Sequence, residues 1–205
     1  LVQVEDFAFR KHHQTRIPLP ENVDGLPNGS HIMTFPIHAE TSVLTQNASS
    51  ADWPRFRGPN GAGVSVGEKP MPVKWSPQEN IRWKAELPGP GSSSPIIVGD
   101  KVFVTSWSGY GTARGERGRQ EDLRRRLTCL DTTTGKILWD KAVEPYLPEE
   151  NFGGMFAENG YATHTPASDG ERVYVFFGKT GVLAFEMNGE QLWKTPVGTD
   201  SERMG

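Results

Sequence analysis

The sequence predicts an all-β fold: a partial β-propeller of about two four-stranded blades preceded by a leading strand. Three observations support it. Short β-branched and aromatic runs alternate with turn residues from Asp52 onward, a strand-turn-strand unit occurs twice, and tryptophans close successive units. Propellers contain roughly four to eight blades of about 40 to 50 residues, so two copies represent a fragment of a larger ring.

Composition narrows the function classes without selecting one. The chain has 205 residues, 35% of them hydrophobic and 23% charged, and its formal net charge is -3. This balance gives no electrostatic attraction toward nucleic acid, so no nucleic-acid partner is predicted. No stretch approaches the roughly 18 apolar residues of a membrane span, and none resembles the apolar core of a signal peptide.

Cys129 is the one cysteine in the sequence, so no intrachain disulfide can form. It lies within the apolar run Leu127–Leu130, where a lone cysteine is usually a small buried hydrophobe. We therefore assign it no chemistry.

Residues 1–50 are predicted to form an irregular N-terminal arm or linker, and residues 51–205 the propeller fragment. The arm contains several prolines, little sustained periodicity and four of the five histidines. The spacing of these histidines fits no standard metal site, and no cysteine or paired carboxylate joins them. The four histidines are His12, His13, His31 and His38.

The first half of the repeat is a pair of strands joined by a tight turn. Ile96–Val98 precedes the turn Gly99-Asp100, which is followed by Val102–Val104. The same pattern recurs later in the chain around the turn Asp169-Gly170, which indicates two copies of one structural unit. The residues that superpose at one constant offset are Pro95, Val102 and Val104 on Pro166, Val173 and Val175.

The second half of the repeat also occurs twice, but its two copies are separated by fewer residues than the two copies of the first half. Gly135 and Trp139 recur as Gly189 and Trp193. Because the second halves lie closer together than the first halves, the first copy is predicted to contain an insertion, around residues 107–126. The blade copies are therefore expected at about 92–143 and 163–197.

Tryptophans mark the ends of successive units, since Trp83, Trp139 and Trp193 follow one another at nearly equal intervals. The predicted strands are short and apolar on both sides. This pattern is typical of sheets that are stacked face to face between neighbours, as blades are in a propeller.

Residues 129–139 resemble the tryptophan-docking motif of quinoprotein propellers, whose pattern is Ala-x-Asp-x-x-x-Gly-Lys-x-x-Trp. Cys129 replaces the small alanine. Residues 184–193 are similar but one residue shorter, with Glu186 in place of Asp. The segments 52–61 and 87–95 also resemble the opening of bacterial PQQ-like repeat propellers, so the resemblance covers about residues 51–205.

The motif implies which residues dock one blade against the next. Asp131 is expected to accept hydrogen bonds from the amides of the Thr-Thr-Thr-Gly turn, and Gly135 to supply the positive φ of that turn. The tryptophan then packs between blades. The predicted blade-docking residues are Trp83, Asp131, Gly135, Trp139, Gly189 and Trp193.

The resemblance implies a cellular compartment more clearly than it implies a catalysed reaction. The family includes periplasmic quinone-dependent alcohol dehydrogenases and scaffold propellers of outer-membrane assembly. We expect a non-catalytic, periplasmic or otherwise extracytoplasmic binding or scaffold module. The alternative is a PQQ-dependent quinoprotein dehydrogenase for alcohol oxidation, with its cofactor site in blades outside this sequence.

A quinone dehydrogenase commonly needs a vicinal disulfide, acidic and amide ligands for calcium, and a catalytic aspartate. The sequence has no Cys-Cys pair, and Glu149–Asn151, beside Pro148, reads as an acidic loop. We therefore predict no catalytic, cofactor-binding or metal-binding residue, and PQQ with calcium belongs only to the alternative.

Two long connections are the candidate binding face, because propellers bind partners through loops at one end of the ring. Residues 108–126 are rich in arginine, with a local net charge of +3, and are expected to form a solvated loop; contact with an anionic partner is the alternative. Residues 144–163 carry several aromatic side chains. The residues predicted to contact a protein or small-molecule partner are Tyr110, Arg114, Phe152, Phe156, Tyr161 and His164.

Overall fold

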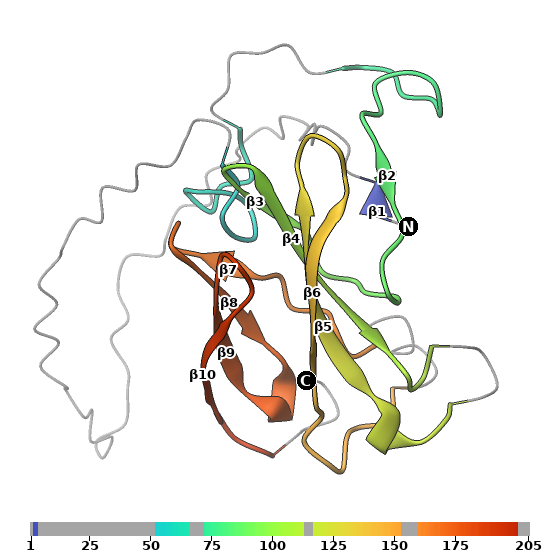
Figure 1. Cartoon of the computed structure of the whole chain (residues 1–205), viewed down its shortest axis with the longest axis vertical. Coiled ribbons are helices and arrows are strands. Elements are labelled where there is room, and N and C mark those ends of the chain that lie inside the picture. Colours follow the sequence, from blue (N-terminus) through green and yellow to red (C-terminus); the bar gives the residue numbers. More distant parts are fainter. Residues whose placement is uncertain (1, 4–51, 66–71, 113–116, 153–159, 201–205) are drawn as a thin grey trace, which may run out of the picture. The chain divides into compact units, whose positions relative to one another are not determined.

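The computed structural model describes residues 2–3, 52–65, 72–112, 117–152 and 160–200 (Figure 1). The predicted N-terminal arm, apart from Val2–Gln3, lies outside these ranges. Two residues predicted for the binding face, Arg114 and Phe156, also lie outside them.

The described residues form two four-stranded antiparallel sheets in which each strand pairs with its neighbour in sequence (Figure 1). They contain no α-helix. The prediction of an all-β fold built from four-stranded units is confirmed, and the two sheets form part of a propeller without closing a ring. The first sheet contains β3 (Ile96–Val98), β4 (Lys101–Ser108), β5 (Arg124–Asp131) and β6 (Ile137–Val143), and the second contains β7 (Ala167–Ser168), β8 (Arg172–Phe176), β9 (Val182–Glu186) and β10 (Gln191–Thr195).

Smaller elements surround the two sheets. β1 (Val2–Gln3) pairs with β2 (Lys84–Ala85), a short strand that precedes the first sheet in sequence. The 3₁₀ helix η1 (Gln120–Asp122) lies between β4 and β5, and η3 (Gly178–Thr180) lies between β8 and β9. No helix in the described segments is long and apolar enough to span a membrane.

The main hydrophobic core combines side chains of both sheets. Strand alternation turns Phe103, Leu127 and Cys129 to one face of the first sheet, where they join residues of β8 and β9. The opposite face of the first sheet packs against the segment before β3, so both of its faces are covered. The buried members of the main core are Ile96, Phe103, Leu127, Cys129, Val143, Val173, Val175, Phe177, Leu183 and Phe185.

The turn between β5 and β6 has the geometry that the sequence motif predicts. Asp131 Oδ1 accepts hydrogen bonds from the backbone amides of Thr133 (3.0 Å) and Thr134 (2.7 Å). Hydrogen bonding, first from the Thr134 hydroxyl, lowers the pKa of the Asp131 carboxyl. Gly135 has a φ of 69°, a conformation that favours glycine.

Trp83 lies directly on this turn. A Cβ atom on Gly135 would lie 2.4 Å from its indole ring, and the Trp83 indole N–H donates a hydrogen bond to the Thr132 carbonyl (2.9 Å). Gly135 is therefore needed for the close approach of the ring as well as for its φ.

The same arrangement recurs one unit later. The Trp139 indole N–H donates to the Met187 carbonyl (3.1 Å), and a Cβ atom on Gly189 would lie 2.8 Å from the Trp139 ring. Trp193, the third member of the series, is 43% exposed, and its ring centroid lies 6.0 Å from that of Tyr174. Blade docking by these tryptophans stays a prediction, and the recurring contacts support it.

A register irregularity occurs at the last strand of each sheet. The β5–β6 pairing shifts between Cys129 and Leu130, and the β9–β10 pairing shifts between Gln191 and Trp193. β6 and β10 are both edge strands. Each sheet therefore ends in a bulged strand.

The prediction of a solvated, arginine-rich loop over residues 108–126 is wrong at both ends. Ser108 is the last residue of β4, and Arg124–Asp131 forms β5, so the connection is shorter. The arginines of β5 have partners within the chain: Arg126 pairs with Asp140, and Arg124 lies 3.2 Å from Glu144. Their charge is therefore compensated locally and is not free for an anionic partner.

Cys129 is expected to resist thiol reagents in the folded protein. The side chain is fully buried, and burial raises the pKa of its thiol to about 12. At pH 8, roughly 10⁻⁴ of such a thiol is ionised, compared with about a quarter at an ordinary pKa near 8.5. Labelling with an aromatic disulfide reagent should be at least ~10³ times slower than in denaturant at the same pH. Rapid stoichiometric labelling without denaturant would contradict this placement.

Candidate binding site at the loop end

The described parts of three connections meet at one end of the sheets: residues 109–112 and 117–123 between β4 and β5, 144–152 and 160–166 between β6 and β7, and 177–181 between β8 and β9. In an antiparallel meander, alternate connections lie at the same end of a sheet. Hydrogen bonds from β5, the β6–β7 connection and η3 link the two sheets here. This loop end carries all the described residues that the sequence predicts for the binding face.

Aromatic side chains at the loop end form a compact group around Tyr161. The ring centroid of Tyr161 lies 6.1 Å from that of Trp107, 5.6 Å from that of Tyr110 and 4.9 Å from that of Phe152. Leu123 and Ala162 complete the group, which we call the aromatic cluster. It is a second hydrophobic core, separate from the core between the sheets.

Two residues predicted to contact a partner, Tyr110 and Tyr161, are buried in the aromatic cluster. Tyr110 is 5% exposed and Tyr161 is 7% exposed, so little of either ring is accessible to a ligand. Burial, and secondly the neighbouring Tyr110, raise the pKa of Tyr161 to about 12. The phenol of Tyr110 donates to Asn151 Oδ1 (2.6 Å) and that of Tyr161 to the Glu150 carbonyl (2.6 Å). Contact of these rings with a ligand would require the cluster to open.

His164 is a predicted binding residue that stays exposed. Its ring packs edge-on against Phe176 at a centroid distance of 4.5 Å, and its carbonyl accepts a hydrogen bond from the Thr105 hydroxyl (3.2 Å). Partial burial of the ring, and secondly the charge of Arg125, lower the pKa of His164. The imidazole is therefore predominantly neutral at pH 7.

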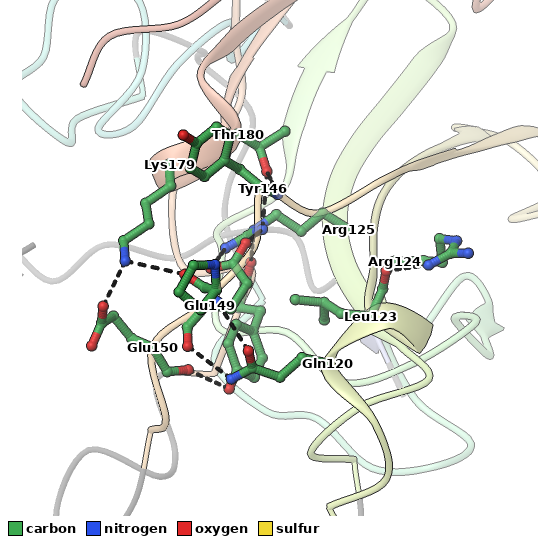
Figure 2. Close-up of polar contacts among 11 residues, drawn as sticks. Gln120, Leu123, Arg124, Arg125, Tyr146, Glu149, Glu150, Lys179 and Thr180 are labelled. Atoms are coloured by element: carbon green, nitrogen blue, oxygen red, sulfur yellow. Dashed lines mark hydrogen bonds and ion pairs between the residues drawn. The ribbon is translucent and has the colours of Figure 1, made fainter. Parts of the chain in front are cut away.

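The central polar feature of the loop end, which the sequence did not predict, is a buried ion pair between Arg125 and Glu149 (Figure 2). Both guanidinium Nη atoms donate to the carboxylate, in a bidentate arrangement. The two side chains are 5% and 3% exposed. Arg125 comes from β5 and Glu149 from the β6–β7 connection, so the pair fixes that connection to an inner strand of the first sheet.

Arg125 also joins two further segments. Its Nε donates to the Tyr161 carbonyl (3.0 Å), and its Nη1 donates to the Thr180 hydroxyl (3.2 Å) in η3 of the second sheet. The Thr180 Oγ1 in turn accepts a hydrogen bond from the Tyr146 amide (3.1 Å). One guanidinium therefore connects strand β5, both described parts of the β6–β7 connection, and the second sheet.

Gln120 holds the same connection from the opposite side (Figure 2). Its side-chain Nε2 donates to the Glu149 carbonyl (2.8 Å), and its Oε1 accepts from the Glu149 amide (3.1 Å). The amide of Gln120 thus pairs with the backbone of Glu149 in the manner of a neighbouring strand. Glu149 is fixed through both its side chain and its backbone.

Residues 149–151, the acidic loop of the sequence, are engaged with neighbouring side chains. Both carboxylate oxygens of Glu149 accept from Arg125, Glu150 accepts from Lys179 Nζ (2.7 Å), and Asn151 accepts from Tyr110. Among the described residues, no group of three or more His, Cys, Asp or Glu side chains could hold a metal ion. The described residues here do not fit a calcium site, because their acidic oxygens already face cations of the chain.

Two apolar side chains project from the part of the connection that is fixed in this way. Tyr146 is 48% exposed and Leu147 is 41% exposed, although the residues beside them are bonded to η3 and β5. Lys179 also donates to the Pro148 carbonyl (3.2 Å). We call Tyr146 and Leu147 the exposed pair. An aromatic and an aliphatic side chain are thus exposed on a backbone segment that hydrogen bonds fix in place.

Comparison with known proteins supplies two matches. A family model described as "Outer membrane protein assembly factor BamB" matches residues 46–204. A polyvinylalcohol dehydrogenase from a Pseudomonas species is 23% identical over 124 residues, which cover 59% of this chain and 16% of that protein. The matched segment therefore spans a small part of the length of this relative.

Proposed function

Since this chain belongs to the family described as outer membrane protein assembly factor BamB, a family of PQQ-like repeats, we propose that it is a non-catalytic binding or scaffold module. The observation that carries the proposal is the exposed pair, Tyr146 and Leu147, on a backbone fixed by a buried ion pair. Interfaces gain most of their affinity from a few aromatic and apolar anchors, and preorganised anchors lose little entropy on binding.

The partner class follows from the family description. We propose that the exposed pair binds a polypeptide of outer-membrane protein assembly, and that the protein works in an extracytoplasmic compartment. The flanking Lys179 and Glu150 pair with each other, so the edge of this surface is polar and close to neutral. An apolar centre with a polar rim is the usual composition of a protein-binding surface.

The first test is binding of an unfolded outer-membrane β-barrel polypeptide, followed by fluorescence anisotropy. Replacing both Tyr146 and Leu147 with alanine should weaken binding at least about 10-fold, since centrally placed anchors commonly contribute about 2 kcal/mol or more. The matched control is the double replacement of Ile137 and Leu138, which are 44% and 49% exposed at the opposite end of the first sheet. Equal losses in both variants, or no binding by the wild type, would refute the proposal.

A second candidate function is favoured by the similarity to polyvinylalcohol dehydrogenase, namely a PQQ-dependent dehydrogenase that oxidises alcohols. The described acidic residues of the loop end do not fit calcium, because Arg125 and Lys179 already neutralise them. The cofactor would therefore need residues other than these.

The second test separates the two functions directly. We expect PQQ with Ca²⁺ to leave the melting temperature of the chain unchanged, and no dye to be reduced when ethanol or polyvinyl alcohol is added. A ligand present at 100 times its Kd would stabilise the folded state by about 2.7 kcal/mol, which a thermal melt resolves. Stabilisation together with alcohol-dependent dye reduction would favour the dehydrogenase.

A further inference from the structure

We propose that residues 144–152 form a strap that closes over the aromatic cluster, and that the guanidinium of Arg125 is the lock that holds the strap closed. The proposal concerns a conformational device of the loop end. It rests on the proposed function only in that the strap carries the exposed pair, Tyr146 and Leu147.

The strap is held by side chains from three other parts of the chain. Arg125 comes from β5, Gln120 from η1, and Thr180 and Lys179 from η3. Among these four side chains, Arg125 is the one that is both charged and buried. It also donates to the Thr180 hydroxyl, which in turn accepts a hydrogen bond from the Tyr146 amide (Figure 2). Removal of Arg125 therefore affects the strap at both Tyr146 and Glu149.

The strap also covers the aromatic cluster. Phe152 packs against Tyr161 at a centroid distance of 4.9 Å, and the Glu150 carbonyl and Asn151 side chain accept the two buried phenol protons. Departure of the strap would leave Tyr110 and Tyr161 with their hydroxyl groups unpaired and their rings uncovered. The closed strap thus keeps an aromatic surface out of solvent.

The lock acts through the cost of a buried unpaired charge. A carboxylate that loses its cation inside a protein either becomes protonated or moves to water, because a buried unpaired charge is strongly disfavoured by its desolvation. Glu149 lies on a connection and can move, whereas Arg125 lies on the inner strand β5, paired on both sides. Loss of Arg125 should therefore release the strap and leave the sheets intact.

Hydrogen exchange of the full chain, read by mass spectrometry, tests the lock. In Arg125→Met, amides of the strap should exchange at least about 10² times faster than in the wild type, whereas β4, β5, β8 and β9 should keep their protection. An apolar fluorescent dye should also bind the variant, because the aromatic cluster is uncovered. In Arg125→Met/Glu149→Met, where no charge is left unpaired, protection of the strap should return.

The matched control is Arg126→Met, which removes the neighbouring partly buried pair with Asp140 from the opposite face of β5. It should leave exchange of the strap unchanged. Two results would overturn the proposal: strap amides that exchange in Arg125→Met at the wild-type rate, or an exchange rate that rises equally in the strap and in both sheets. No partner is present in this experiment, so its outcome is independent of whether the exposed pair binds an assembly polypeptide.

Discussion

Replacing Glu149 with alanine is expected to lower the free energy of unfolding by about 3–5 kcal/mol, the usual cost of removing one member of a buried ion pair. The 5% exposed guanidinium of Arg125 would keep its charge, and its remaining acceptors are the Tyr161 carbonyl and the Thr180 hydroxyl. Because Arg125 lies on an inner strand, its backbone cannot move away from the site as a connection can. Urea unfolding followed by circular dichroism measures the change.

The control for this prediction is Glu150→Ala. The side chain of Glu150 is 52% exposed and pairs with Lys179, and exposed ion pairs contribute about 0–1 kcal/mol. The double replacement of Arg125 and Glu149 by methionine should cost less than Glu149→Ala alone, since neither charge remains. Equal losses of unfolding free energy in the Glu149 and Glu150 variants would show that the buried ion pair stabilises the protein no more than the exposed one.

Replacing Phe185 with alanine is the second variant with a large expected effect, again about 3–5 kcal/mol of unfolding free energy. Phe185 is 1% exposed and belongs to the core shared by the two sheets. Truncation would leave a cavity that β4, β5 and β8 can fill only in part. Thermal and urea unfolding of the variant measure the loss.

Phe176 provides a control of the same residue type in the same sheet. It lies on β8, is 37% exposed and does not belong to the core between the sheets. Its replacement by alanine should cost less than about 1.5 kcal/mol, since more than a third of its surface is already exposed and it fills no space in that core. A loss as large as that of Phe185 would contradict the assignment of the core to one face of the second sheet.

The strands and their pairing could be predicted because the repeat supplies two independent copies of each signal. The positions of Gly135 and Gly189 relative to the tryptophans predicted where the turns lie, and the structure has positive φ at both. The lengths of β4 and β5 were underestimated, because Thr105, Ser106 and the arginines of β5 interrupt the apolar pattern although they belong to strands.

The site was harder to predict, because its central contact joins residues far apart in sequence. Arg125 has the same parity in β5 as Leu127 and Cys129, which is a signal that its side chain points inward. Nothing in the local sequence identifies Glu149 as its partner, since the pair depends on the path of a long connection. Tyr110, Phe152 and Tyr161 lie in connections, as the sequence predicts, but their burial around Tyr161 depends on three connections meeting.

The register irregularities at β6 and β10 bear on how this protein behaves at high concentration. A straight edge strand offers a regular row of amides and carbonyls on which a strand of another molecule can grow, which is a common route to fibrils. In both sheets the last strand is bulged near its start, between Ile137 and Trp139 of β6 and between Gln191 and Trp193 of β10. The bulge interrupts the row of amides and carbonyls on each of these strands, so β6 and β10 are poor templates for strand-by-strand self-assembly.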